Sequence, residues 1–383
     1  MLEPKLRFKN FSGEWKEEKL EELSIKIGDG IHSTPSYSDT GKYFFINGNN
    51  IKDNKIFISE TTKRVDENEY VKYRLPLNYN TILISINGTI GNLGYYNYEK
   101  VILGKSCGYI KLKKEVNKYF LLNLLKTNKI QTYFFQELTG TTIKNLSLQT
   151  LKNTKIKLPI DKEQKKIADF LSSVDVKINL TENKLELLKK YKKGIMQKIF
   201  NQELRFKDEN GNIYPMWKNK KLGELCKITT GKLDANAMVE NGIYRFYTCA
   251  KEFYFINEYA FDTEALLISG NGANVGYIHY YKGKFNAYQR TYILDNFYEN
   301  ILFIKYILEK NLKTRIEKEK NSGNTPYIVL SVLTDMELKI PCLEEQQKIA
   351  DFLSSIDNKI EKISDELENL KEFKKGLLQQ MFV

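Results

Sequence analysis

The chain has 383 residues, of which 42% are hydrophobic and 28% charged, and its formal net charge is +12. This length permits two or three domains with cores of their own, and the positive charge indicates a polyanion such as nucleic acid or an anionic membrane surface, unless it only solvates the exterior. The first residues do not resemble a signal peptide and no apolar run could span a bilayer, so we expect a cytoplasmic protein with no membrane partner.

The four cysteines and two histidines are scattered along the chain. No Cys-x-x-Cys pair occurs, which is typical of reduced, buried thiols and not of a disulfide framework or a zinc site. His32 and His279 are far apart in sequence, so a histidine-based metal site or catalytic dyad is not expected. We therefore predict no metal ligands and no catalytic residues.

Residues 1–157 are predicted to form a mixed α/β domain. Short β-rich runs (KYFFI, TILISI and CGYIKL) alternate with turn residues, and a helical stretch covers residues 119–134. The polar loop at 28–37 either faces a ligand or is a structured turn, and His32 has no visible partner for a role as base or ligand. Candidate contact residues in this domain are Asp29, His32, Ser33, Thr34, Asn87, Thr89, Lys105, Ser106, Thr141, Thr142 and Lys144.

Most of these candidates have a plain structural alternative. The Asn-Gly pairs at 87–88 and 271–272 are also typical of hairpin turns. The loop at 141–144 fits phosphate binding, helix capping or turn chemistry.

Residues 158–203 are predicted to form a long scaffold helix. Pro159 stands just ahead of it, where proline is tolerated. Apolar residues follow alternating steps of three and four, with Thr181 and Lys192 in the gaps, which predicts a heptad seam. The seam contains Ile167, Leu171, Val174, Ile178, Leu185 and Leu188.

Residues 204–339 are predicted to form a second mixed α/β domain. Its β-rich runs are GIYRFY, ALLISG and RTYIL, and a helical stretch covers 301–316. GNGANVG resembles a dinucleotide fingerprint, but its spacing is wrong and a strand-like segment follows it. An adjacent Gln-Arg pair suits adenine and guanine contacts or a surface cross-strand pair. The candidates here are Asn271, Asn274, Gln289, Arg290, Asn324, Thr325 and Tyr327.

Residues 340–383 repeat the scaffold helix. PCLEEQQKIADFLSSIDNKI from Pro341 matches PIDKEQKKIADFLSSVDVKI from Pro159 without a gap, a shift of 182 residues. The domain entries match too, since Trp15, Leu20 and Leu23 correspond to Trp217, Leu222 and Leu225. The second seam contains Ile349, Leu353, Ile356, Ile360, Leu367 and Leu370.

The duplication predicts an α+β fold with pseudo-twofold symmetry. Two mixed α/β domains are joined by two long coiled-coil helices, because each seam needs a cover and the other copy offers a matching one. The alternative is that each helix lies on its own domain, which explains one copy but not two matched copies. Similar ends with divergent middles indicate one scaffold with two different recognition surfaces.

These motifs resemble the specificity subunit of type I restriction–modification systems, over essentially the whole chain. The residues that carry the resemblance are Pro159, Glu163, Gln164, Ile167, Ala168, Leu171 and Asp175, with Pro341, Glu345, Gln346, Ile349, Ala350, Leu353 and Asp357, the two domain entries and the Gly-Thr-Thr-Ile of 140–143. The resemblance implies that each domain reads half of a split DNA site and that the helices pack antiparallel. It also implies two methyltransferase subunits, which bind S-adenosylmethionine, and two restriction subunits, which use ATP and Mg²⁺, while this chain holds no cofactor.

Two other functions compete with this hypothesis. A self-contained methyltransferase needs an Asn/Asp-Pro-Pro-Tyr/Phe motif and a Gly-rich cofactor loop, and neither occurs, since Asn324-Thr325-Pro326-Tyr327 lacks the second proline. The sequence also has no G-x-x-x-x-G-K-[ST] phosphate loop, so ATPase activity is not expected. A coiled-coil adaptor with a basic surface would bind DNA weakly, uniformly and with a steep salt dependence. Divergent domains on a matched scaffold favour specific recognition over both.

Overall fold

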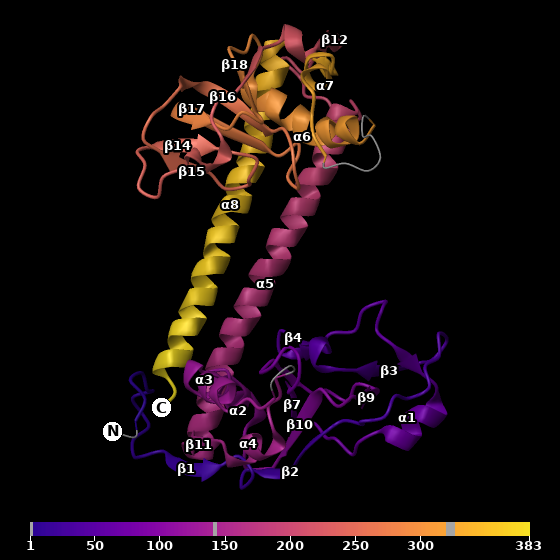
Figure 1. Cartoon of the computed structure of the whole chain (residues 1–383), viewed down its shortest axis with the longest axis vertical. Helices are drawn as coiled ribbons and strands as arrows, with labels where there is room; N and C mark the ends of the chain where they lie inside the picture. Colours follow the sequence, from indigo (N-terminus) through magenta and orange to yellow (C-terminus); the bar gives the residue numbers. More distant parts are fainter. Residues whose placement is uncertain (1–2, 141–143, 319–325) are drawn as a thin grey trace. The chain divides into compact units, whose positions relative to one another are not determined.

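A computed structural model of the chain describes residues 3–140, 144–318 and 326–383. It divides into two compact units. Unit 1 consists of Met1–Glu182 and Glu366–Val383, and unit 2 of Asn183–Asp365. The two long helices, α5 (Asp161–Phe200) and α8 (Leu343–Gln380), each contribute one segment to both units (Figure 1).

The described residues of unit 1 form two small sheets, two strand pairs and four short helices. Its four-stranded antiparallel sheet has the order β2-β10-β7-β8, and its three-stranded sheet has the order β6-β3-β9, with β3 parallel to β9. The strand pairs are β1-β11 and β4-β5. The bounds are β1 Lys16–Lys19, β2 Ser24–Asp29, β3 Tyr43–Ile46, β4 Ile51–Lys52, β5 Lys55–Ile56, β6 Arg64–Val65, α1 Glu67–Tyr73, β7 Thr81–Ser85, β8 Leu93–Tyr95, β9 Val101–Leu103, β10 Cys107–Leu112, α2 Lys118–Leu125, α3 Asn128–Gln136, α4 Leu148–Asn153 and β11 Lys155–Leu158.

Unit 2 contains one larger sheet. Six strands follow the order β13-β18-β16-β17-β14-β15, with β14 parallel to β17, and β12 pairs with β19. The bounds are β12 Lys218–Lys221, β13 Lys227–Thr230, β14 Tyr244–Tyr247, β15 Tyr254–Ile256, β16 Phe261–Ser269, β17 Ile278–Ala287, β18 Thr291–Asp295, α6 Ile301–Lys318, α7 Leu330–Thr334 and β19 Glu337–Ile340.

Apart from the β4-β5 pair of unit 1, the two units share one strand plan, which is interrupted at one place in unit 1. Strand β17 pairs with β16 along one part, as β8 does with β7 in unit 1, and with β14 along another, as β9 does with β3. It therefore corresponds to both β8 and β9. In unit 1 the chain between β8 and β9 turns at Tyr98, whose φ is 65°. The break separates the unit 1 strands into two sheets, whereas the unbroken β17 keeps the unit 2 strands in one.

Close backbone approach explains one matched pair of glycines. A Cβ atom on Gly30 would lie 2.0 Å from the Leu103 carbonyl oxygen, and one on Gly231 would lie 2.0 Å from that of Ala287. No side chain fits at such a distance, so only glycine permits the chain to cross there. The crossing fixes the loops that follow β2 and β13.

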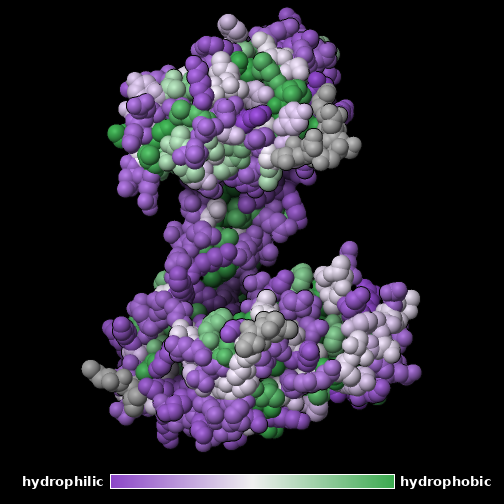
Figure 2. Space-filling model, viewed as in Figure 1, coloured by the Kyte–Doolittle hydropathy of each residue, from purple (hydrophilic) through white to green (hydrophobic). Residues whose placement is uncertain are grey.

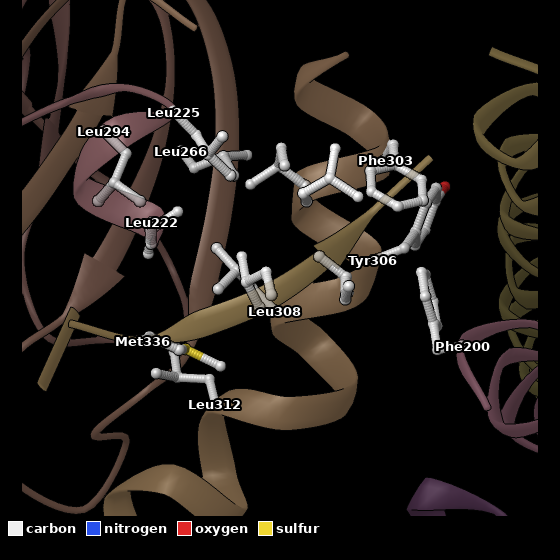
Figure 3. Close-up of a cluster of buried hydrophobic side chains, with 14 of the residues drawn as sticks. Phe200, Leu222, Leu225, Leu266, Leu294, Phe303, Tyr306, Leu308, Leu312 and Met336 are labelled. Carbon is white, nitrogen blue, oxygen red and sulfur yellow. The ribbon is translucent and has the colours of Figure 1, made fainter. Parts of the chain in front are cut away.

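The core of unit 2 joins its sheet to the helices. Figure 3 shows side chains of α6 packed between the sheet and the end of α5. The cluster includes Phe200, Leu222, Leu225, Leu266, Leu294, Phe303, Tyr306, Leu308, Leu312 and Met336. The core of the unit 2 domain therefore includes apolar residues from the end of α5 and from the start of α8.

The predicted antiparallel helix pairing is confirmed within each unit. In unit 1, Asp175 pairs with Lys374 and Glu182 pairs with Lys371, so the residue number in α8 falls as that in α5 rises. In unit 2, Lys192 pairs with Asp357 at 2.7 Å. The residues predicted for the two seams are buried or half-buried.

The alternative, that each helix lies on its own domain, is also partly correct. Ile349, Leu353 and Ile356 of α8 belong to the same buried cluster as the unit 2 domain residues and the last turns of α5. The first turns of α8 therefore cover two surfaces at once. A heptad pattern alone could not show this, because the spacing of its apolar residues does not tell whether a helix or a sheet covers them.

Polar and charged side chains dominate the exposed face of each unit (Figure 2). Among the described residues, no helix is long and apolar enough to cross a membrane.

Candidate nucleic-acid interface

Five loops of unit 1 meet at one edge of its recognition domain, which we call loop edge 1. They follow β2, β3 and β7, connect β9 to β10, and precede α4. Backbone hydrogen bonds join them, namely Ile31 N to Leu103 O (2.8 Å), Gly104 N to Ile46 O (2.8 Å), Ile86 N to Ser106 O (3.0 Å) and Leu146 N to Ile86 O (2.8 Å). The edge is therefore a hydrogen-bonded platform that gathers segments more than 100 residues apart.

Most unit 1 candidates that the structure describes lie on loop edge 1. Ser33, Thr34, Thr89, Lys105 and Lys144 are exposed there. Thr141 and Thr142 lie outside the described residues. Exposed hydroxyls and ammonium groups suit contacts with phosphates and base edges.

The expectation that His32 has no partner was wrong. Its Nε2 lies 2.8 Å from Asp29 Oδ2, while the His32 side chain remains 72% exposed. The pair bridges the end of β2 and the following loop, three residues apart, so it orders that loop. The imidazole can still offer its other nitrogen outward.

Two unit 1 candidates serve the platform itself. The Ser106 hydroxyl donates to Asn47 Oδ1 at 2.8 Å and accepts from the Gly48 amide at 2.9 Å, which ties the β9–β10 turn to the loop after β3. Asn87 is half-buried and forms a bridge with Asn145. These residues position their neighbours, and Asn47 is a contributor that the sequence did not reveal.

Unit 2 builds the same platform, which we call loop edge 2. Here the bonds join Gly270 N to Arg290 O (2.8 Å), Ile328 N to Gly270 O (2.7 Å), Tyr288 N to Tyr247 O (2.9 Å) and Gln289 N to Leu233 O (2.9 Å). The loops involved follow β13, β14 and β16, connect β17 to β18, and precede α7. The backbone of the edge is thus repeated, whereas its side chains are not.

The predicted match between Lys105-Ser106 and Gln289-Arg290 is confirmed as a positional one. Each pair forms the two-residue turn between a parallel bridge, at Gly104 or Tyr288, and the next strand. Gln289 Nε2 donates to Asp234 Oδ1 at 2.8 Å, and both side chains of the unit 2 pair are exposed. Asp234 is a second residue that sequence reasoning missed, because it lies 55 positions from its partner.

The Asn-Gly pairs lie in turns, but not in the two-residue hairpin loops that were the alternative for them, because the strands on either side are farther apart in sequence. Gly88 and Gly272 have φ values of 74° and 80°, a left-handed conformation that glycine adopts readily, whereas Asn87 and Asn271 do not have positive φ. Asn271 forms a bridge with Tyr327, whose side chain is 54% exposed. Both turns form part of their loop edges.

Asn274 serves the platform of unit 2 in the same way. Its Nδ2 donates to the Cys249 carbonyl at 3.1 Å, so it supports the loop after β14. Asn324 and Thr325 lie outside the described residues.

A half-buried histidine stabilises loop edge 2. His279 Nε2 lies 3.0 Å from the Ala250 carbonyl oxygen, and the ring packs edge-on against Tyr247 and Tyr277. Burial lowers the pKa of His279, so the ring is neutral near pH 7 and donates to the carbonyl. Its role is to hold the loop after β14.

The described residues contain no group of three or more His, Cys, Asp or Glu side chains placed to hold a metal ion. The chemistry that the two edges do offer is hydrogen bonding by amides, hydroxyls and cations. Two unlike polar edges on a repeated scaffold define a duplicated recognition protein.

Comparison with known proteins identifies the kind of recognition. Residues 12–190 and 215–372 each match the family described as Type I restriction modification DNA specificity domain. The chain therefore belongs to the family of type I restriction–modification specificity subunits, with two copies of the specificity domain.

Individual relatives agree with this family. The specificity subunit of the type I restriction enzyme EcoDI from Escherichia coli is 41% identical over 172 residues, which is 44% of this chain and only 38% of that relative. The MjaVIII specificity subunit of Methanocaldococcus jannaschii is 29% identical over 79% of this chain and 78% of its own. The crystal structure of a type I S subunit from M. genitalium shares the fold, with a TM-score of 0.66 and 20% identity over 100% of this chain and 99% of its own.

Proposed function

We propose that this chain reads an asymmetric, bipartite DNA site, with one half-site for each loop edge, and holds two methyltransferase subunits. The observation that carries the proposal is the repeated platform with unlike side chains. Lys105 and Ser106 occupy the turn in unit 1 where Gln289 and Arg290 stand in unit 2. One platform with two sets of side chains suits two different half-sites.

The side chains of loop edge 2 suit base reading. Arginine makes paired hydrogen bonds to guanine and glutamine makes them to adenine in the major groove. Asp234 holds Gln289 at 2.8 Å, which reduces the rotamer entropy that a long side chain loses on binding. Arg290 is exposed beside it and provides the second contact.

The methyltransferase subunits would dock on the outer face of α5. Val176 and Leu180 in unit 1 are 57% and 62% exposed, and Leu187 and Tyr191 in unit 2 are 65% and 51% exposed. Each pair is four residues apart, so its side chains share one helix face. Because the seam residues are buried on the other side of α5, each unit offers an apolar stripe to a partner helix.

The partners would supply the chemistry. S-adenosylmethionine belongs to the methyltransferase subunits, which methylate adenine, and ATP and Mg²⁺ belong to two restriction subunits. A solved structure similar to this chain, with a TM-score of 0.53 and 16% identity, comes from work on the assembly of a type I system, and the likeness extends over 96% of this chain and 97% of its own. For our chain we propose a non-catalytic role at the centre of such an assembly.

Methylation mapping tests the proposal. The chain is expressed with its neighbouring methyltransferase subunit in a host without DNA methylation, and adenine methylation is mapped across the genome. We expect a gapped, asymmetric motif that appears only when both chains are present. Methylation by the partner alone, unchanged by this chain, would contradict the proposal and favour a non-specific adaptor.

A further inference from the structure

Unit 1 contains an open pocket of about 590 Å³ between its recognition domain and its scaffold segments. The walls come from the turn after β7 at Gly91, from the start of α3 at Asn128, and from Asp175, Lys371 and Lys374 of the scaffold. Lys126, in the link between α2 and α3, also lines it. Lysines outnumber carboxylates in this lining, which holds Lys52, Lys126, Lys371, Lys374 and Lys375 against Asp53, Asp175 and Glu182.

Lys126 has no carboxylate partner among the described residues. Its Nζ donates to the neutral Asn54 Oδ1, and the nearby carboxylate of Asp175 is already paired with Lys374. Burial lowers the pKa of Lys126 to about 8. A half-buried ammonium group in this setting needs an anion, because desolvation disfavours the charged form until it is paired.

Unit 2 shows what a complete network looks like at the equivalent place. Phe120 and Phe303 pack against the matched tryptophans, with ring centroids 5.7 and 5.9 Å away, and the sixth residue after each is Lys126 or Glu309. The charge at this position is therefore reversed between the units.

Glu309 closes the unit 2 network. It lies 2.7 Å from Lys305 and 3.3 Å from Lys192, and Lys192 also pairs with Asp357 at 2.7 Å. Two lysines meet two carboxylates in unit 2. At the matching place in unit 1 a lysine replaces Glu309. Among the described residues no carboxylate lies within ion-pair distance of Lys126, although Asp53 acts on it from farther away.

The helix break of unit 1 adds donors on the same side. Helix α2 ends at Leu125 and α3 begins at Asn128, whereas α6 runs through the equivalent position without interruption. Thr127 precedes α3 and makes no side-chain cap, so the first amides of this nine-residue helix stay available. A helix N-terminus attracts anions.

We propose that this pocket binds one phosphate group of the DNA backbone, clamped by Lys126, Lys374 and the first amides of α3. The inference rests on the proposed function. It favours DNA because the turn that lines the pocket at Gly91 also carries Asn87 and Thr89 on loop edge 1. A duplex held at that edge therefore has its backbone next to the pocket. The closed network of unit 2 makes no such contact, so the complex gains one phosphate contact on one side only.

The test compares Lys126→Gln with Lys129→Gln in the chain complexed with its methyltransferase and bound to its methylation site. Lys129 is an exposed lysine on α3 that does not line the pocket. We expect Lys126→Gln to weaken binding roughly tenfold, as the loss of one charge-assisted contact does. The slope of log K against log salt should fall by about 0.9, as for one neutralised phosphate. The control should leave both unchanged.

Uncharged methylphosphonate linkages identify the source of the phosphate. One such linkage, moved along the site, should weaken wild-type binding at a single position and leave Lys126→Gln unaffected there. If inorganic phosphate raises the melting temperature of the wild-type chain alone, and no linkage distinguishes the two proteins, the pocket binds a free anion and our DNA assignment is wrong.

The two proposals fail in different ways. A wild-type salt slope in Lys126→Gln overturns the phosphate site, while a retained preference for the methylation site leaves the proposed function intact. Loss of that preference in the wild-type complex itself would contradict the proposed function. Lys126→Gln should stay folded, since it removes a poorly solvated charge, and an unchanged or higher melting temperature checks this.

Discussion

Units 1 and 2 agree where the scaffold meets the recognition domain and differ where each unit faces a ligand. In both units the glutamine of the repeated Glu-Gln pair joins the helix to the domain. Gln164 accepts from the Asn117 amide at 3.1 Å and donates to the Pro159 carbonyl at 3.0 Å. Gln346 makes the same two bonds, to Asn300 and Pro341, at 2.9 Å each.

The neighbouring glutamates show that matched residues need not do equal work. Glu163 binds the guanidinium of Arg7 at 2.8 Å. Glu345 binds Arg205 at 2.6 Å and also accepts from Trp217 Nε1 at 3.0 Å. The corresponding buried Trp15 Nε1 has no hydrogen-bond partner within the described part of the chain. Both copies of the repeat therefore keep the arginine–glutamate contact between scaffold and domain, but the number of hydrogen bonds to the glutamate differs between them.

The largest expected difference between the units is in the stability lost when the repeated glutamate is removed. We expect Glu345→Ala to destabilise unit 2 by about 3–5 kcal/mol, because it leaves a largely buried guanidinium and an indole N–H without their acceptor. Glu163→Ala should cost unit 1 less, since no indole N–H loses an acceptor there. Both arginines keep backbone carbonyl acceptors, Arg7 that of Gly13 and Arg205 those of Tyr214 and Pro215. Hydrogen exchange resolved by peptide measures each unit separately. Equal losses would show that the tryptophan bond contributes nothing.

The next effect is on specificity, and it should be confined to one unit. Arg290→Ala should cost about 1–3 kcal/mol of discrimination at one base pair, since it removes a paired contact. Methylation mapping should then show one half-site relaxed and the other unchanged. Lys105→Ala changes the same turn in unit 1, at the position of Gln289, and should weaken binding without altering the half-site that unit 2 reads. Relaxation of both half-sites by Arg290→Ala would contradict the division of labour.

The smallest effect is a pH dependence specific to unit 1. Burial lowers the pKa of Lys118 to about 8. Its Nζ donates to the Tyr79 carbonyl oxygen and lies 3.2 Å from the centre of the Tyr79 ring. Between pH 8 and the ordinary lysine value near 10.5, the unfolded chain holds a proton that the folded chain has released. The contribution of Lys118 to stability therefore rises with pH across this window.

Lys118→Met should remove that contribution. The stability of the variant relative to wild type should be highest at or below pH 8 and should fall as the pH rises toward 10. Denaturant unfolding at four pH values measures the difference, and comparing the two proteins cancels the ionisation of thiols and tyrosines. A difference independent of pH would show that Lys118 has an ordinary pKa in the folded chain.

The scaffold could be predicted from the sequence because it is periodic and repeated. Heptad spacing gave the buried residues of α5 and α8, and the repeat gave their pairing. The antiparallel direction came from the resemblance to specificity subunits. The equivalence of Lys105-Ser106 with Gln289-Arg290 followed from the same alignment. Regular structure places side chains at fixed intervals along one chain segment, so a pattern in that segment is enough to find them.

The loop edges could be predicted only as loops. Bonds such as Gln289 to Asp234 and Ser106 to Asn47 join residues 55 and 59 positions apart, and nothing periodic connects them. Lys126 was missed for the same reason, since its missing carboxylate is visible only beside Glu309 of the other unit. Which polar side chains meet depends on where separate loops are brought together by the fold.

The division of the chain has a consequence for the order of its synthesis. Unit 2 is one continuous stretch, whereas unit 1 requires residues 366–383, which leave the ribosome after all of unit 2. The Leu6 amide bonds to the Gln380 carbonyl at 2.8 Å, and the Phe382 ring packs against Trp15 and Phe120. The half that is translated first is thus completed last, and until then its apolar scaffold face is the surface that a chaperone would need to shield.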